Sequence, residues 1–159
     1  MEIIKNKIGD IVPGKWIPFW SDGDFSTHDL LEHVIAYTGK ADIYLTAFSI
    51  SEDAIRRLLL IKEDGLINNI TCLFNNQMIR FKTVLYWFIS NITTNIRFAP
   101  CHAKVIIITG KFSVMIITSG NLTKNRRLES GVICSVDKSV AKMLNEFMNT
   151  YNNADHYDI

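Results

Sequence analysis

The most informative segment of the sequence is KVIIITGKFSVMIIT, residues 104–118. Two apolar runs rich in β-branched residues flank Gly110-Lys111, a pair that suits a two-residue type II′ turn. The segment therefore predicts a β-hairpin with strands at residues 104–109 and 112–118.

Polar side chains flank both ends of this hairpin. With a two-residue loop, His102 is expected opposite Ser119, and directly paired residues share a face of a sheet. Lys104 follows His102 by two residues and Asn121 follows Ser119 by two, so all four are expected on that face. Each residue alone has an ordinary structural explanation, since histidines near strand ends and Ser-Gly-Asn turns are common. Together they favour a site for a phosphate group.

The segment from His102 to Glu129 resembles the signature of the phospholipase D superfamily. That signature is a His-x-Lys motif followed by an aspartate, a Gly-Ser-x-Asn element and a glutamate. His102 and Lys104 match the first motif. Ser119 and Asn121 match the second, and Glu129 stands near the expected glutamate.

Two positions depart from the family pattern. Thr109 replaces the aspartate, and Thr118 replaces the glycine that precedes the serine. Because Thr109 has the opposite parity to His102 and Lys104 along the chain, its side chain is expected to face away from them. Some nuclease-like members of the superfamily also lack the aspartate, so we retain the catalytic interpretation.

The resemblance implies phosphodiester cleavage without a metal or another cofactor. In the family, one histidine attacks phosphorus to form a phosphohistidine, a second histidine protonates the leaving oxygen, and water releases the product. By this resemblance His102 is the nucleophile. Lys104, Asn121 and Ser119 are then expected to stabilise the phosphate oxygens. Glu129 is expected to orient the imidazole.

The chain contains one His-x-Lys motif, although the implied mechanism needs two histidines. His28, His33 and His156 have no lysine two positions later. A complete site therefore requires two subunits, and we expect a homodimer in which the hairpins meet across a two-fold axis, as in single-motif members of the family.

The remaining sequence predicts a single domain over residues 1–159. Alternating elements favour an α/β fold, a three-layer α/β/α sandwich like that of the superfamily, and the hairpin makes the sheet mixed. Outside the hairpin, strands are predicted at about residues 2–8, 15–20, 42–48, 70–74, 95–99 and 129–136, and helices at about 27–37, 51–64, 77–90 and 138–151.

No metal site is predicted. Cys72, Cys101 and Cys134 have long, irregular spacings that match neither a disulfide framework nor a zinc site. His28 and His33 are five residues apart on a predicted helix and do not share a face.

Aromatic residues gather near the start of the chain, at Trp16, Phe19, Trp20 and Phe25. They suit stacking on bases. Packing in the core or at a subunit interface is the interpretation that we favour.

Local charge indicates the substrate better than global charge does. The 17 Lys and Arg residues nearly balance 16 Asp and Glu, so the net charge of +1 gives no strongly basic field. Lys124, Arg126 and Arg127 nevertheless follow Asn121 closely and are expected to hold neighbouring phosphates. With the small size and single motif, which resemble the family's minimal nucleases, this predicts an endonuclease acting on DNA or RNA.

Two other functions remain open. One is a non-catalytic nucleic-acid-binding or regulatory relative that kept the phosphate pocket, and the other is a phospholipid phosphodiesterase. The sequence shows neither a signal peptide nor an apolar run of about 18 residues, which predicts a cytoplasmic protein without a membrane partner.

Overall fold

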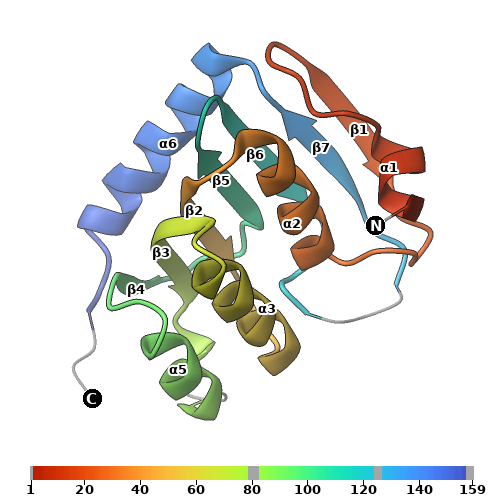
Figure 1. Ribbon diagram of the computed structural model, residues 1–159. Coiled ribbons are helices and arrows are strands. Elements are labelled where there is room, and N and C mark those ends of the chain that lie inside the picture. Colours follow the sequence, from red (N-terminus) through yellow and green to blue (C-terminus); the bar gives the residue numbers. More distant parts are fainter. Residues whose placement is uncertain (1, 79–82, 124–126, 157–159) are drawn as a thin grey trace.

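The computed structural model describes residues 2–78, 83–123 and 127–156, with a seven-stranded sheet at its centre (Figure 1). The strand order is β1-β7-β6-β5-β2-β3-β4. The strands are β1 (Trp16–Trp20), β2 (Ala41–Ala47), β3 (Ile67–Asn75), β4 (Ile96–Ala99), β5 (Val105–Thr109), β6 (Ser113–Thr118) and β7 (Ser130–Cys134). The helices are α1 (Glu2–Ile8), α2 (Thr27–Thr38), α3 (Glu52–Glu63), α5 (Thr83–Ser90) and α6 (Asp137–Asn152).

The sheet is mixed. Strands β2, β3 and β4 are parallel, whereas β5, β6, β7 and β1 join the sheet in antiparallel pairs. Parallel neighbours need a crossover connection, and α3 supplies the one between β2 and β3. As a result, β1, β2, β3, β4 and β6 all end at one edge of the sheet, where β5 and β7 begin. We call this the carboxyl edge.

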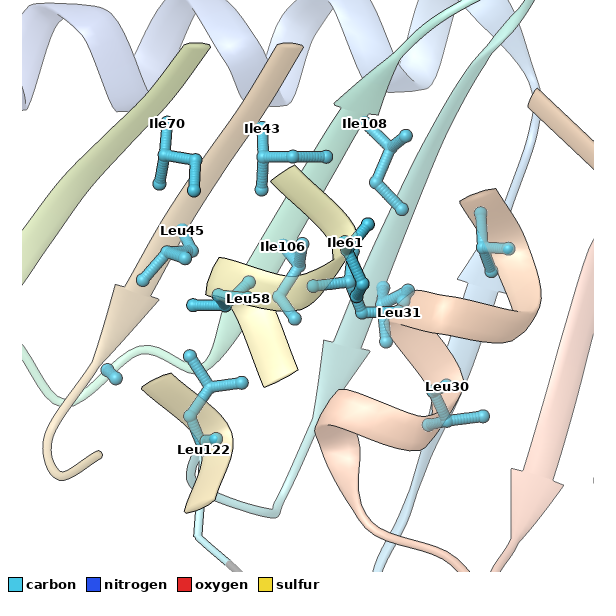
Figure 2. Close-up of a cluster of buried hydrophobic side chains, with 14 of the residues drawn as sticks. Leu30, Leu31, Ile43, Leu45, Leu58, Ile61, Ile70, Ile106, Ile108 and Leu122 are labelled. Atoms are coloured by element: carbon cyan, nitrogen blue, oxygen red, sulfur yellow. The ribbon is translucent and has the colours of Figure 1, made fainter. Parts of the chain in front are cut away.

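Helices cover both faces of the sheet. Strand β5 is apolar throughout because it is buried on both faces. Ile106 and Ile108 pack beneath α2 and α3, while Ile107 between them packs on the α6 side. The predicted α/β fold with a mixed sheet is confirmed. Figure 2 shows the larger core layer, which includes Leu30 and Leu31 of α2, Leu58 and Ile61 of α3, and Ile43, Leu45, Ile70, Ile106 and Ile108 of the sheet.

Serine side chains fix the starts of the two helices over this layer. Ser26 Oγ accepts a hydrogen bond from Asp29 N, and the Asp29 carboxylate accepts one from Ser26 N at 2.8 Å, which forms a capping box at α2. Ser51 Oγ accepts a hydrogen bond from Ala54 N at the start of α3. Both helices therefore begin at defined positions.

The predicted strand at residues 2–8 is wrong, because this segment forms α1. Ile4 and Ile8 are both buried and lie four residues apart, so they share one face of a helix. That face joins the core layer formed by α2 and the sheet. Helical spacing of the buried residues outweighs the strand preference of the isoleucines in this segment.

The hairpin is confirmed, but its register differs by one residue from the prediction. Thr109 pairs with Ser113, which leaves a three-residue loop. This loop packs against the end of α2, where Lys111 N donates to Thr38 O at 2.9 Å. A Cβ added at Gly110 would lie only 2.5 Å from the same oxygen. A contact with a distant helix thus outweighs the local preference for a two-residue turn.

The helices of the described ranges are too short or too polar to cross a membrane.

Two leucines of α3 test the account of the core. Leu58 is 0% exposed and Leu60 is 54% exposed. Leu58→Ala is expected to lower the free energy of unfolding by about 2–5 kcal/mol, because it leaves a cavity beneath the helix. Leu60→Ala, the matched control on the same helix, is expected to change it by no more than about 0.5 kcal/mol. Urea unfolding of both variants measures the difference, and equal losses would contradict the packing described.

Candidate active site

The carboxyl edge gathers the polar residues that the sequence singled out. They come from three strands that are neighbours in the sheet, β5, β6 and β7. His102 and Lys104 lie just before β5, Ser119 and Asn121 just after β6, and Glu129 just before β7.

His102 and Lys104 form a close pair. Lys104 Nζ lies 3.4 Å from His102 Nδ1 and donates to His102 O at 3.0 Å. The exposed His102 ring packs against Phe48, with 4.8 Å between ring centroids. An ammonium group has only donors, so a hydrogen bond from Lys104 to this atom requires the tautomer in which Nδ1 is the acceptor. The pair thus places the Lys104 ammonium group beside the imidazole.

Side chains at the ends of β2 and β3 hold the backbone that carries this pair. Thr46 Oγ1 donates to Ala103 O and accepts from Val105 N, both at 2.9 Å. Asn75 Nδ2 donates to Cys101 O, also at 2.9 Å. The sequence analysis missed Thr46 and Asn75. Their only signal is that they are polar residues at or just beyond the end of a predicted strand.

Ser119 is hydrogen-bonded to Glu129. Its Oγ donates to the Glu129 carboxylate and accepts from Ser130 N at 3.1 Å. The backbone of Glu129 is itself fixed by the buried Ser21, because Glu129 N donates to Ser21 Oγ at 2.9 Å and Ser21 N donates to Glu129 O at 2.8 Å. The end of β1 therefore sets the position of this carboxylate.

The corrected hairpin register changes the predicted facing of Ser119. Thr118 N donates to Lys104 O at 3.1 Å, so Lys104 lies opposite Thr118. Ser119 follows in the alternate pleat and faces the other side of the sheet. The prediction that Lys104 and Ser119 share a face is therefore wrong, although both remain at the carboxyl edge.

Asn121 lies in a loop that two helix starts anchor. Thr27 Oγ1 donates to Gly120 O at 3.3 Å, and Ser51 N donates to Leu122 O at 2.7 Å. Between these anchors, Asn121 is half-buried, and its Oδ1 atom has no hydrogen-bond partner within the described part of the chain. Buried polar atoms without a partner are uncommon, so this oxygen is a candidate acceptor for a donor group of a ligand.

The position of the family's aspartate lies far from these groups. Thr109 ends β5 and pairs with Asp42 and Ser113. Five residues of strand separate it from Lys104, or about 16 Å. At that distance the Thr109 side chain does not contact the groups at the carboxyl edge.

The predicted phosphate-binding residues are only partly described. Arg127 is exposed and lies two residues before Glu129, at the carboxyl edge. Lys124 and Arg126 fall outside the described residues. Across residues 2–78, 83–123 and 127–156, the His, Cys, Asp and Glu side chains form no group of three or more that is suited to a metal ion.

His28, in the first turn of α2, is a buried histidine beside the start of α3. Its Nε2 lies 3.4 Å from Asp53 Oδ2, and its Nδ1 has no partner among the residues that the structure describes. Burial lowers the pKa of His28, while the nearby carboxylates of Asp29 and Asp53 act in the opposite direction. The folded state thus favours the neutral ring.

The buried hydroxyl of Thr46 gives a test of how the His102 segment is held. Thr46→Val removes one donor and one acceptor without changing the volume, so Val105 N loses its side-chain partner and Ala103 O keeps only the weak contact from Cys101 Sγ at 4.0 Å. We expect a loss of about 1–3 kcal/mol in the free energy of unfolding. Thr46→Ser keeps the hydroxyl and is expected to retain more of this stability. Denaturant titrations compare the two, and a serine variant as unstable as the valine variant would contradict the assignment.

The lowered pKa of His28 predicts a pH dependence of stability. Below the ordinary histidine pKa of about 6.5 the unfolded chain binds a proton that folded His28 does not bind. Stability is therefore complete above that pH and is lost as the pH falls toward the folded pKa. His28→Gln removes this titration, so its free energy of unfolding is expected to fall less than that of the wild type between about pH 7.5 and 5.5. Identical pH profiles would contradict the prediction.

Comparison with known proteins identifies the fold. No protein-family model and no curated protein matches the sequence. Among solved structures, Nuc from Salmonella typhimurium, a phospholipase D family member, is similar with a TM-score of 0.71 and 20% sequence identity, over 91% of this chain and 99% of that one. NucT from Helicobacter pylori has a TM-score of 0.59 and 13% identity, over 90% of this chain and 100% of that one.

A third similar structure is TrmBL2, an archaeal chromatin protein described as having a novel mode of DNA binding. Its TM-score is 0.59 at 10% identity, over 97% of this chain and 59% of that one. Identities this low establish a shared fold rather than a shared activity. The chain has the fold of the phospholipase D family.

Proposed function

We propose that this chain is a metal-independent phosphodiesterase that cleaves nucleic acid through a phosphohistidine intermediate on His102. The pairing of the His102 imidazole with the Lys104 ammonium, 3.4 Å apart at the carboxyl edge, is the observation that carries the proposal. The similarity of the fold to Nuc and NucT supports it.

The reaction is a double displacement. An unprotonated nitrogen of His102 attacks phosphorus, a P–N bond forms, and the bond from phosphorus to the leaving oxygen breaks. His102 of the partner subunit donates a proton to that oxygen. The same residue then takes a proton from water, whose oxygen attacks phosphorus and breaks the P–N bond. Lys104 neutralises the non-bridging oxygens in both steps, and the Asn121 amide donates a hydrogen bond to them.

Ser119 and Glu129 have a positioning role in this proposal. Because Ser119 Oγ donates to the Glu129 carboxylate, its hydroxyl proton is not available to the phosphate. Ser119 therefore supports Glu129. The role expected of Glu129, to orient the His102 imidazole, stays a prediction, because no contact joins these two side chains in the described structure. This assignment replaces the direct contact between Ser119 and phosphate that the sequence suggested.

Two subunits complete the site. The chain has one His-x-Lys motif, so the second histidine comes from a homodimer whose carboxyl edges face each other. Solution mass tests this part of the proposal, because a strictly monomeric active enzyme could not supply two His102 side chains to one phosphate.

Nucleic acid is the substrate class that we favour. His102 is exposed, which leaves room for a long polymer to pass over the site. Arg127 adds positive charge at the same edge, and Lys124 and Arg126 precede it in the sequence.

A second function has its own support. TrmBL2 has a similar fold and is described by its DNA binding, and the present chain departs from the family motif at Thr109 and Thr118. A nucleic-acid-binding protein without turnover is therefore the alternative.

Cleavage by matched histidine variants tests the proposal. Wild type, His102→Asn and His156→Asn are incubated with single-stranded DNA, duplex DNA and RNA in excess chelator, and both histidines are exposed, so neither change disturbs the core. We expect cleavage by the wild type and His156→Asn, and a loss of about a thousand-fold or more in His102→Asn. Cleavage that persists in His102→Asn, or that needs added magnesium, would contradict the mechanism. Binding without cleavage by any of the three would favour the alternative.

A further inference from the structure

Two tryptophans of the edge strand β1 are exposed although their aromatic neighbours are buried. Phe19 and Phe25 pack together in the core with 6.0 Å between ring centroids, as the sequence suggested. Trp16 is 52% exposed and Trp20 is 57% exposed. Because burying an indole ring is strongly favourable, a ring left in water on an ordered strand needs an explanation.

The two exposed tryptophans differ in their distance from the candidate active site. Trp20 ends β1 at the carboxyl edge and pairs with Ser130 of β7, and Ser130 in turn lies beside Ser119. Directly paired residues share a face, so Trp20 stands on the same face as Ser119, about 10 Å away across two strand spacings. Trp16 is at the opposite end of the strand, about 13 Å from Trp20.

Two carboxylates, Asp22 and Asp24, follow Trp20 closely in the chain and pair with one ammonium group, that of Lys7. The pKa of Asp22 is lowered, chiefly by the hydrogen bond from Lys7 Nζ at 2.8 Å. Lys7 also pairs with Asp24 at 2.6 Å, so the two carboxylates beside the ring share one cation.

We propose that Trp20 is a stacking platform for a base of single-stranded nucleic acid whose scissile phosphate lies at His102 and Lys104. This inference rests on the function proposed above and adds a preference for unpaired substrate. The faces of bases are open to an aromatic ring only where the strand is not stacked within a duplex, and such stacking tolerates any base sequence. Because Lys104 and Trp20 face opposite sides of the sheet, such a strand crosses over the carboxyl edge on its way from β5 to β1.

Trp16 supplies a matched control for the test, since it has the same residue type, strand, face and nearly the same exposure. Trp20→Ala and Trp16→Ala are made in the His102→Asn background, so that a fluorescently labelled oligonucleotide is bound without being cut. We expect Trp20→Ala to weaken binding of the single strand about ten-fold. Trp16→Ala is expected to leave it within about two-fold, and Trp20→Phe to restore most of it.

Three results would overturn the inference while leaving the proposed function intact. The first is an equal loss of single-strand binding in Trp20→Ala and Trp16→Ala. The second is a loss of duplex binding in Trp20→Ala as large as its loss of single-strand binding. The third is a change in the solution mass of Trp20→Ala, which would make Trp20 a subunit contact. The proposed function is tested separately, by comparing cleavage by the wild type with cleavage by His102→Asn, both with Trp16 and Trp20 unchanged. A wild type that neither binds nor cuts nucleic acid would overturn both.

Discussion

Burial of β5 on both faces is the constraint on which the candidate site depends. Ile106 and Ile108 pack under α2 and α3, and Ile107 packs on the α6 side, so the strand has no freedom to slide or rotate without exposing apolar surface. Because His102 and Lys104 lie immediately before this strand, the same packing sets where they emerge at the carboxyl edge. The position of the candidate site thus depends on the packing of the core.

At the carboxyl edge, side chains from neighbouring strands hold the backbone of the candidate site in place. Parallel strands β2 and β3 end beside the start of β5, and Thr46 and Asn75 use that proximity to bind the backbone around His102. On the other side, the end of β1 fixes Glu129 through Ser21. Backbone at strand ends has unpaired donors and acceptors, and here side chains from neighbouring strands satisfy them. Elements distant in sequence therefore support each half of the site.

The sequence was enough to predict the α/β fold class and the placement of polar residues at the ends of the hairpin. Both predictions use hydrophobic periodicity and motif spacing, which are local properties. The sequence failed where distant contacts decide the outcome. The loop that contacts Thr38 leaves the hairpin register one residue away from the prediction, so Ser119 no longer shares a face with Lys104, and its hydroxyl donates to Glu129. For Thr109 a local rule was enough, because the alternation of side chains along a strand already predicted that it faces away from His102. The polarity of Thr46 and Asn75 near predicted strand ends does not reveal their role, because that role depends on which strands become neighbours.

The central claim is a covalent intermediate on His102, and the stereochemical course at phosphorus tests it most directly. A phosphorothioate diester of one configuration is cleaved in water labelled with heavy oxygen, and the configuration of the product is determined. Two successive in-line displacements, the first by His102 and the second by water, each invert phosphorus, so the account predicts net retention. Net inversion would show that water attacks directly and would contradict the phosphohistidine.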